Sequence, residues 1–194
     1  MEVRKTGFFI EISFVFAIGC SFGWIVEVVF RRFWSGKNAE HRWVNPGYLR
    51  GPWLPVYGLG LLLLYLLSGL SPYFAAGGLL GRVLLVLMMA VAATVVEYIS
   101  GVFSKKILHA TLWDYSGEWG NIEGIICPRF AAFWLIACAA YLFVFHASLR
   151  AFIVSHAHHP ATVLILGAFL GIFFSDVITT SKRTLKTYKI FNRS

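Results

Sequence analysis

Charged side chains are scarce in this sequence. Only 13% of the 194 residues are Asp, Glu, Lys or Arg, whereas a typical soluble domain has about 25%. Hydrophobic residues make up 58% of the chain, and several runs approach the roughly 20 apolar residues that cross a bilayer. This balance excludes a soluble globular domain and predicts an all-α, polytopic membrane protein.

Cysteines and enzyme signatures are also few. Cys20, Cys127 and Cys138 lie in or beside apolar runs and lack CxxC spacing, so we expect neither a disulfide framework nor a metal site. The Walker A, HExxH, GxSxG and GxGxxG patterns are missing, and we expect no bound cofactor. Any ATP that drives this protein must therefore bind to another chain.

Five apolar runs are expected to span the membrane, at residues 8–30, 53–70, 79–103, 122–149 and 161–180. The first run is longer than the core of a signal peptide and has no A-x-A-like cleavage site, which favours a spanning helix. We expect one transmembrane domain over residues 1–181, followed by a basic cytoplasmic tail over residues 182–194.

The basic residues predict the orientation in the membrane. Five spans place four of the 17 basic residues on one side, namely Arg4, Lys5, Arg82 and Arg150, and leave 17 − 4 = 13 on the other. Cytoplasmic loops carry the excess of Lys and Arg, so we expect the N-terminus outside and the C-terminus inside, in the plasma membrane. The net charge of +8 then fits anionic lipids and not nucleic acid.

Residues 45–60 (NPGYLRGPWLPVYGLG) form the most unusual loop. Proline fixes φ and glycine admits positive φ, so the loop is expected to be shaped and not flexible. Asn45, Arg50 and Tyr57 can form hydrogen bonds at the membrane surface. Arg50 could hold a phosphate or a carboxylate in a bidentate manner, or it could be a cytoplasmic anchor.

Three acidic residues, Glu27, Glu97 and Asp176, lie near the predicted inner ends of their helices. A charge at bilayer depth costs about 2.5–3.5 kcal/mol, so these side chains should face protein or water. Glu27 and Glu97 could belong to a ligand site or could form structural ion pairs, for which Arg31, Arg32 and Arg50 are the candidate partners. We interpret Asp176 as a local partner of the basic tail.

The second polar loop carries WDYS at residues 113–116 and Asn121. Aromatic residues alone would indicate an interfacial belt, but Asp114 has no role in such a belt. We therefore predict that Trp113, Asp114, Tyr115 and Asn121 shape or line a site.

A weak internal repeat is expected. Residues 23–30 resemble residues 94–103, which matches Glu27 with Glu97, and residues 45–52 have a fainter echo at 121–128. Two units of helix, loop and helix in the same orientation would form a parallel repeat.

Five motifs occur together: GW-x-x-E at 23–27, G-x-L-x-GP-x-x-P-x-YG-x-G at 47–60, E-Y-x-x-G at 97–101, WDYS at 113–116 and N-I-x-G at 121–124. In this order and spacing, the chain resembles the ABC-transporter type IV, or CmpB-like, permease family over about residues 8–145. The resemblance implies a transport function and a separate ATPase subunit.

Five helices are few for a complete permease, so we expect several copies of the chain to assemble. The GxxxG spacings at 19/23, 77/81 and 167/171 could serve helix contacts within or between chains.

Two functional hypotheses remain open, besides a scaffold role. The first is a permease-like protein in which a polar pocket near the cytoplasmic leaflet binds a small or amphiphilic solute. The second is a membrane-embedded enzyme acting on a lipid head group, with carboxylates as acid and base. The residues expected at the pocket are Glu27, Asn45, Arg50, Tyr57, Glu97, Trp113, Asp114, Tyr115 and Asn121.

Overall fold

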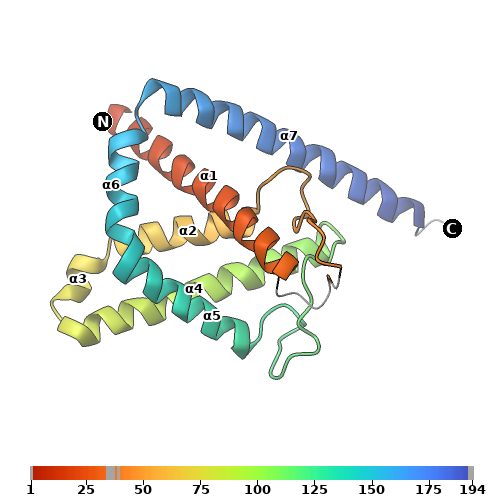
Figure 1. The fold of residues 1–194 in the computed structure, drawn as a ribbon, viewed down its shortest axis with the longest axis horizontal. Helices are drawn as coiled ribbons and strands as arrows, with labels where there is room; N and C mark the ends of the chain where they lie inside the picture. Colours follow the sequence, from red (N-terminus) through yellow and green to blue (C-terminus); the bar gives the residue numbers. More distant parts are fainter. Residues whose placement is uncertain (1, 34–37, 39, 192–194) are drawn as a thin grey trace.

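The computed structural model describes residues 2–33, 38 and 40–191, and helices dominate this part of the chain (Figure 1). In chain order the elements are α1 (Glu2–Phe33), α2 (Pro55–Ser68), α3 (Ser71–Ala75), α4 (Gly78–Lys106), α5 (Pro128–Ala140), the π-helical segment η1 (Tyr141–Phe145), α6 (His146–His156) and α7 (Pro160–Phe191). The predicted all-helical fold class is confirmed.

Within the described residues, four stretches are long and apolar enough to cross a membrane: Gly7–Phe33, Gly78–Lys106, Pro128–His156 and Pro160–Ile190. The remaining predicted span corresponds to α2, which has only 14 residues and is therefore about 21 Å long. That length is shorter than a hydrocarbon core of about 30 Å. A turn at Gly69 and the short helix α3 follow α2.

Two helix ends differ from the predicted spans. The fourth span begins at Pro128 and not at residue 122, because Ile122 and Ile126 pair across a tight loop. The fifth helix does not stop at residue 180 but continues through the basic segment to Phe191. The basic segment is thus helical as far as the structure describes it.

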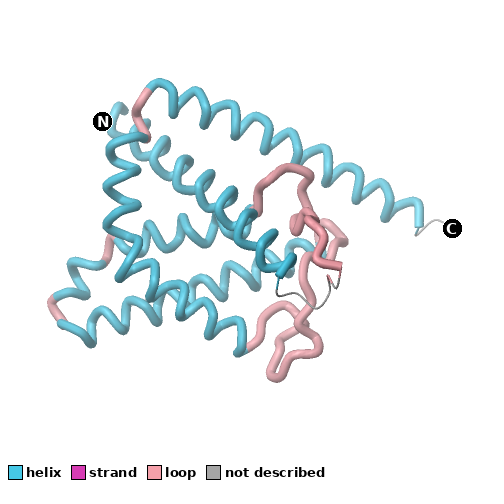
Figure 2. The backbone as a smooth tube through the Cα atoms, in the orientation of Figure 1, coloured by secondary structure: helices cyan, strands magenta, loops and turns pink. Residues whose placement is uncertain are grey.

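The helices α1, α4 and α7 run toward the end of the molecule where α7 ends, whereas α2 and the stretch from α5 to α6 run away from it (Figure 1). Both long loops, residues 40–54 and 107–127, gather at the end of the molecule where α7 ends, and we call this the loop end (Figure 2). The N-terminus lies at the opposite end, beside the turn between α6 and α7. The polar loops and the C-terminus therefore share one end, as the five-pass prediction requires, while its assignment to the cytoplasm stays a prediction.

Three apolar clusters hold the described residues together, and the third of them joins Cys20 of α1 and Phe173 of α7 through Leu49 and Trp53 of the loop between α1 and α2. The first joins α2, α4 and the α5–η1 segment through buried side chains that include Leu64, Leu85, Met89 and Cys138. The second packs Val15 of α1 against Ile153 and Ala157 near the end of α6. Many other large apolar side chains are exposed, as expected for a surface that lipid covers.

Candidate functional site

Glu27 lies near the loop end of α1 and meets two donors. The Tyr57 hydroxyl donates to its Oε2 at 2.9 Å, and the Arg31 Nε donates to its Oε1 at 3.0 Å. The Glu27 side chain is 22% exposed, so the carboxylate is half-buried. The structure therefore contains the Glu27–Arg31 ion pair that the sequence left open, and it adds a tyrosine from the next helix.

A close approach of α1 and α2 places Tyr57 at this carboxylate. Gly23 is one turn before Glu27, and the Tyr57 ring packs on its backbone. The backbone N–H of Leu54 donates to the Cys20 carbonyl at 3.0 Å, which ties the start of α2 to α1. Pro55 then begins α2, a position where the missing N–H costs nothing.

Glu97 is the corresponding carboxylate on α4, and it is only 7% exposed. The Trp134 indole N–H donates to its Oε2 at 2.9 Å, and the Tyr115 hydroxyl donates to its Oε1 at 3.2 Å. Among the described residues, no Lys, Arg or His forms an ion pair with it. Glu97 is thus a buried acid held by neutral donors.

The side chain of Tyr115 is held in place beside Glu97. Its ring stacks on Phe130 with 4.2 Å between centroids, and its backbone N–H donates to the Gly124 carbonyl at 2.9 Å. Burial raises the pKa of the Tyr115 hydroxyl, the negative charge of Glu97 raises it further, and Glu27 adds to the effect. The pairs Glu27–Tyr57 and Glu97–Tyr115 therefore share one electrostatic environment, which we call the carboxylate–tyrosine cluster.

The WDYS loop is built by its own polar side chains. The Trp113 indole donates to the Ile125 carbonyl at 2.8 Å, and Asp114 Oδ1 accepts from the Ser116 backbone N–H at 2.9 Å. Gly124 has a φ of +65°, and a Cβ there would lie 2.9 Å from Asp114 Oδ1. The positions of Trp113 and Asp114 indicate that they shape the loop, while Tyr115 alone reaches the buried acid.

Asn121 closes the same loop. Its Nδ2 donates to the carbonyls of Ser116 and Glu118 at 3.2 and 2.9 Å, and its Oδ1 accepts from the Gly124 N–H at 3.0 Å. All these bonds stay within the loop, so Asn121 positions Tyr115 without contacting Glu97 in this arrangement.

Asn45 holds the loop of residues 40–54 in shape, as Asn121 does for the WDYS loop. Its Oδ1 accepts from the Trp24 indole at 2.9 Å and from the Gly47 N–H at 3.1 Å. Its Nδ2 donates to the carbonyls of Leu49 and Arg50 at 2.8 and 3.2 Å. The Arg50 side chain is exposed, and the backbone of this residue forms hydrogen bonds with Asn45 and Asp176.

Asp176 of α7 attaches the loop of residues 40–54 to α7. Its Oδ2 accepts from the backbone N–H groups of Arg50 and Gly51, both at 2.9 Å, and from the Trp53 indole at 3.0 Å. Its Oδ1 accepts from the Thr180 hydroxyl at 3.0 Å, one turn along α7. The predicted local role is therefore incomplete, because the main partners lie 123 to 126 residues away in the sequence.

Sequence reasoning missed two further residues. Trp134 donates directly to Glu97, but an indole in an apolar run resembles any membrane tryptophan. Trp53 likewise donates its indole N–H to a buried acid, Asp176. The only signal available for Asp176 was an acid inside an apolar helix, which by itself marks a functional or paired residue.

The two halves of the predicted repeat share an order of elements. Each has a helix with a half-buried or buried carboxylate, a loop held by an asparagine, and a next helix that begins at proline. The donors differ, since Tyr57 lies on α2 whereas Tyr115 lies in a loop. The repeat itself stays a prediction.

Comparison with known proteins identifies a family. The family model described as "Putative ABC-transporter type IV" matches residues 14–181. The match extends beyond the predicted residues 8–145 and includes Asp176. Searches of curated proteins and of solved structures found no match. Its apolar helices and its family make the chain an integral membrane protein related to transport, and it belongs to the ABC-transporter type IV family.

Proposed function

We propose that the chain is the membrane-spanning part of a transporter and that the carboxylate–tyrosine cluster contacts the solute at the loop end. Glu97 carries this proposal, because it is a buried acid on a spanning helix and its hydrogen-bond donors among the described residues are the Tyr115 hydroxyl and the Trp134 indole. A buried carboxylate without a cation is costly. A cationic group of a small or amphiphilic solute would remove that cost.

The two acids have different parts in this proposal. Glu27 already has Arg31 as a partner, so its charge is largely compensated. Glu97 is the uncompensated charge that the solute meets. Tyr57 donates a hydrogen bond to Glu27, and Tyr115 donates one to Glu97. Each hydroxyl can donate to a different acceptor instead without a change of charge.

We also propose a separate ATPase subunit as a partner. The family name supports this partner, and the sequence has no Walker A motif of its own. The loop end carries both long loops and the end of α7 (Figure 2), so the ATPase would bind there.

Solute counterflow in proteoliposomes tests the site without an energy source. The probe is hexyltrimethylammonium, unlabelled inside and labelled outside, because its permanent charge prevents passive leakage. We expect counterflow by the native chain and a roughly ten-fold lower rate for Glu97→Gln, the effect of about 1.4 kcal/mol of lost binding.

Glu40→Gln is the matched control, because Glu40 is an exposed acid paired with Arg42, and its rate should equal that of the native chain. Equal rates for Glu97→Gln and the native chain would refute the assignment. Transport of the anion hexanesulfonate at the same rate as hexyltrimethylammonium would refute the proposal that the solute is cationic. Turnover of lipid head groups without counterflow would favour the enzyme instead.

A further inference from the structure

The helix α7 is longer than a membrane requires. Its 32 residues extend over about 48 Å, whereas a hydrocarbon core is about 30 Å thick. The apolar part, residues 160–180, already covers about 31 Å. The residues from 181 onward therefore continue as a helix at the depth of the lipid head groups.

One face of this continuation is attached to the loops. Its members recur every four residues: Asp176, Thr180, Thr184 and Tyr188. The Tyr48 hydroxyl donates to Thr184 Oγ1 at 2.9 Å, and the Tyr188 ring stacks on His109 with 3.6 Å between centroids. Contacts from both polar loops thus fix the rotation of α7 about its axis.

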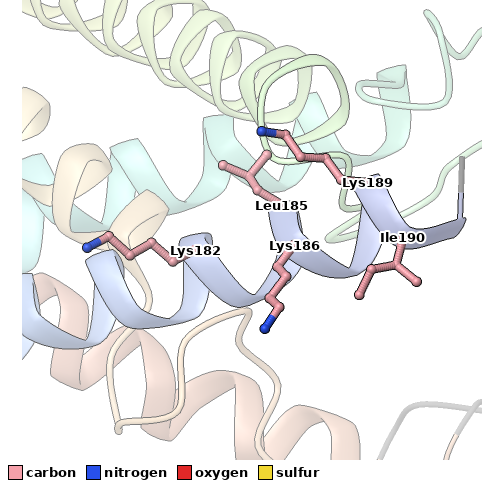
Figure 3. A pocket seen from close by; sticks show the side chains of 5 residues that line it. All are labelled: Lys182, Leu185, Lys186, Lys189 and Ile190. Atoms are coloured by element: carbon pink, nitrogen blue, oxygen red, sulfur yellow. The ribbon is translucent and has the colours of Figure 1, made fainter. Parts of the chain in front are cut away.

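The other face is basic and open. Lys182, Lys186 and Lys189 are exposed, and together with Leu185 and Ile190 they line a hollow on the last turns of α7. Figure 3 shows these five side chains spreading from one stretch of the helix. The hollow has a volume of about 510 Å³. Among the described side chains, none of these lysines takes part in an ion pair.

We propose that this face binds the head group of an anionic phospholipid. The three lysines supply positive charge within one hollow, and the two apolar side chains supply a surface for the start of the acyl chains. The position at head-group depth presents this hollow to lipid, and lysines at that depth attract anionic lipids. This site is separate from the carboxylate–tyrosine cluster and does not depend on the proposed solute.

Native mass spectrometry of the full chain released from nanodiscs tests the site. The nanodiscs contain phosphatidylcholine and phosphatidylglycerol in a four-to-one ratio, and the bound lipids are counted on each variant. The native chain should retain phosphatidylglycerol in preference to phosphatidylcholine. Lys186→Gln/Lys189→Gln should weaken that retention by roughly 25-fold, about five-fold for each lysine.

Lys106→Gln/Arg183→Gln is the matched control, because it removes two exposed charges at the same end and leaves the hollow intact. It should retain the lipid nearly as well as the native chain. The same loss in both double variants would overturn the proposal in favour of a diffuse positive surface. Retention of the two lipids by the native chain in the four-to-one ratio of the nanodisc would also overturn it. Circular dichroism of each variant separates loss of the site from loss of the fold.

Discussion

Replacing Asp176 with alanine is expected to lower the free energy of unfolding by about 3 kcal/mol. The carboxylate accepts hydrogen bonds from the backbone N–H groups of Arg50 and Gly51 and from the buried indole of Trp53. Alanine leaves these donors without their acceptor, and a buried donor without a partner costs more than a hydrogen bond contributes. Denaturant unfolding in detergent, followed by circular dichroism, measures the change.

Thr179→Ala is the control for Asp176→Ala, because the Thr179 hydroxyl donates only within α7, to the Ser175 carbonyl at 2.7 Å. Asp176→Asn keeps one oxygen acceptor and should lose less than alanine does. If Asp176→Ala and Thr179→Ala unfold at the same denaturant concentration, the attachment of the loop to α7 contributes nothing to stability.

The variant Gly23→Ala is expected to destabilise the protein by about 2 kcal/mol, the typical cost of overpacking. A Cβ at this position would lie 2.3 Å from both Cβ and Cγ of Tyr57. The Cβ of Tyr57 is bonded directly to the backbone of α2 and cannot rotate away, so the helix itself must move. Because Tyr57 donates to Glu27, the hydrogen bond at the candidate site should be lost together with the packing.

Gly171→Ala is the matched control, because nothing lies within 4 Å of a Cβ at Gly171 in α7. Alanine is a better helix former than glycine by about 1 kcal/mol, so this variant should be neutral or more stable. Thermal unfolding of the two variants in the same detergent compares them directly. Equal stability of both would show that α1 and α2 do not need the glycine contact.

The GxxxG spacings look alike in the sequence but have different surroundings in the structure. Gly19 and Gly23 lie against the backbone and ring of α2, whereas Gly167 and Gly171 meet open space. Spacing predicts which residues share a helix face. It carries no information about whether another helix lies on that face.

Several features of the fold were predictable because they depend on local chemistry. The apolar runs indicated the spanning helices, and their alternation brought the two polar loops to one end (Figure 2). The Glu27–Arg31 pair follows from a spacing of four residues on a helix. The short length of α2 was not predictable, because the apolar run of residues 53–70 extends past both ends of the helix, into the loop before Pro55 and into the turn at Gly69 and Leu70.

The candidate site was predictable in its members but not in its contacts. The sequence predicted both Glu97 and Tyr115 as site residues. Their contact depends on the path of the WDYS loop, which the hydrogen bond between Asn121 and Gly124 helps to fix. Trp113 and Asp114 were predicted to shape or line the site, and their hydrogen bonds shape the loop. Donor and acceptor types are readable from a sequence, whereas their partners depend on the folded backbone.

The π-helical segment η1 has a consequence for how the third long membrane span is divided between its neighbours. A π turn holds one residue more than an α turn, and each added residue rotates the following face by about 100°. Before the segment, Cys138 packs with α2 and α4, and after it Ile153 packs on α1. A single crossing therefore contacts both halves of the bundle: its first part packs with α4, which carries Glu97, and its last part packs with α1, which carries Glu27.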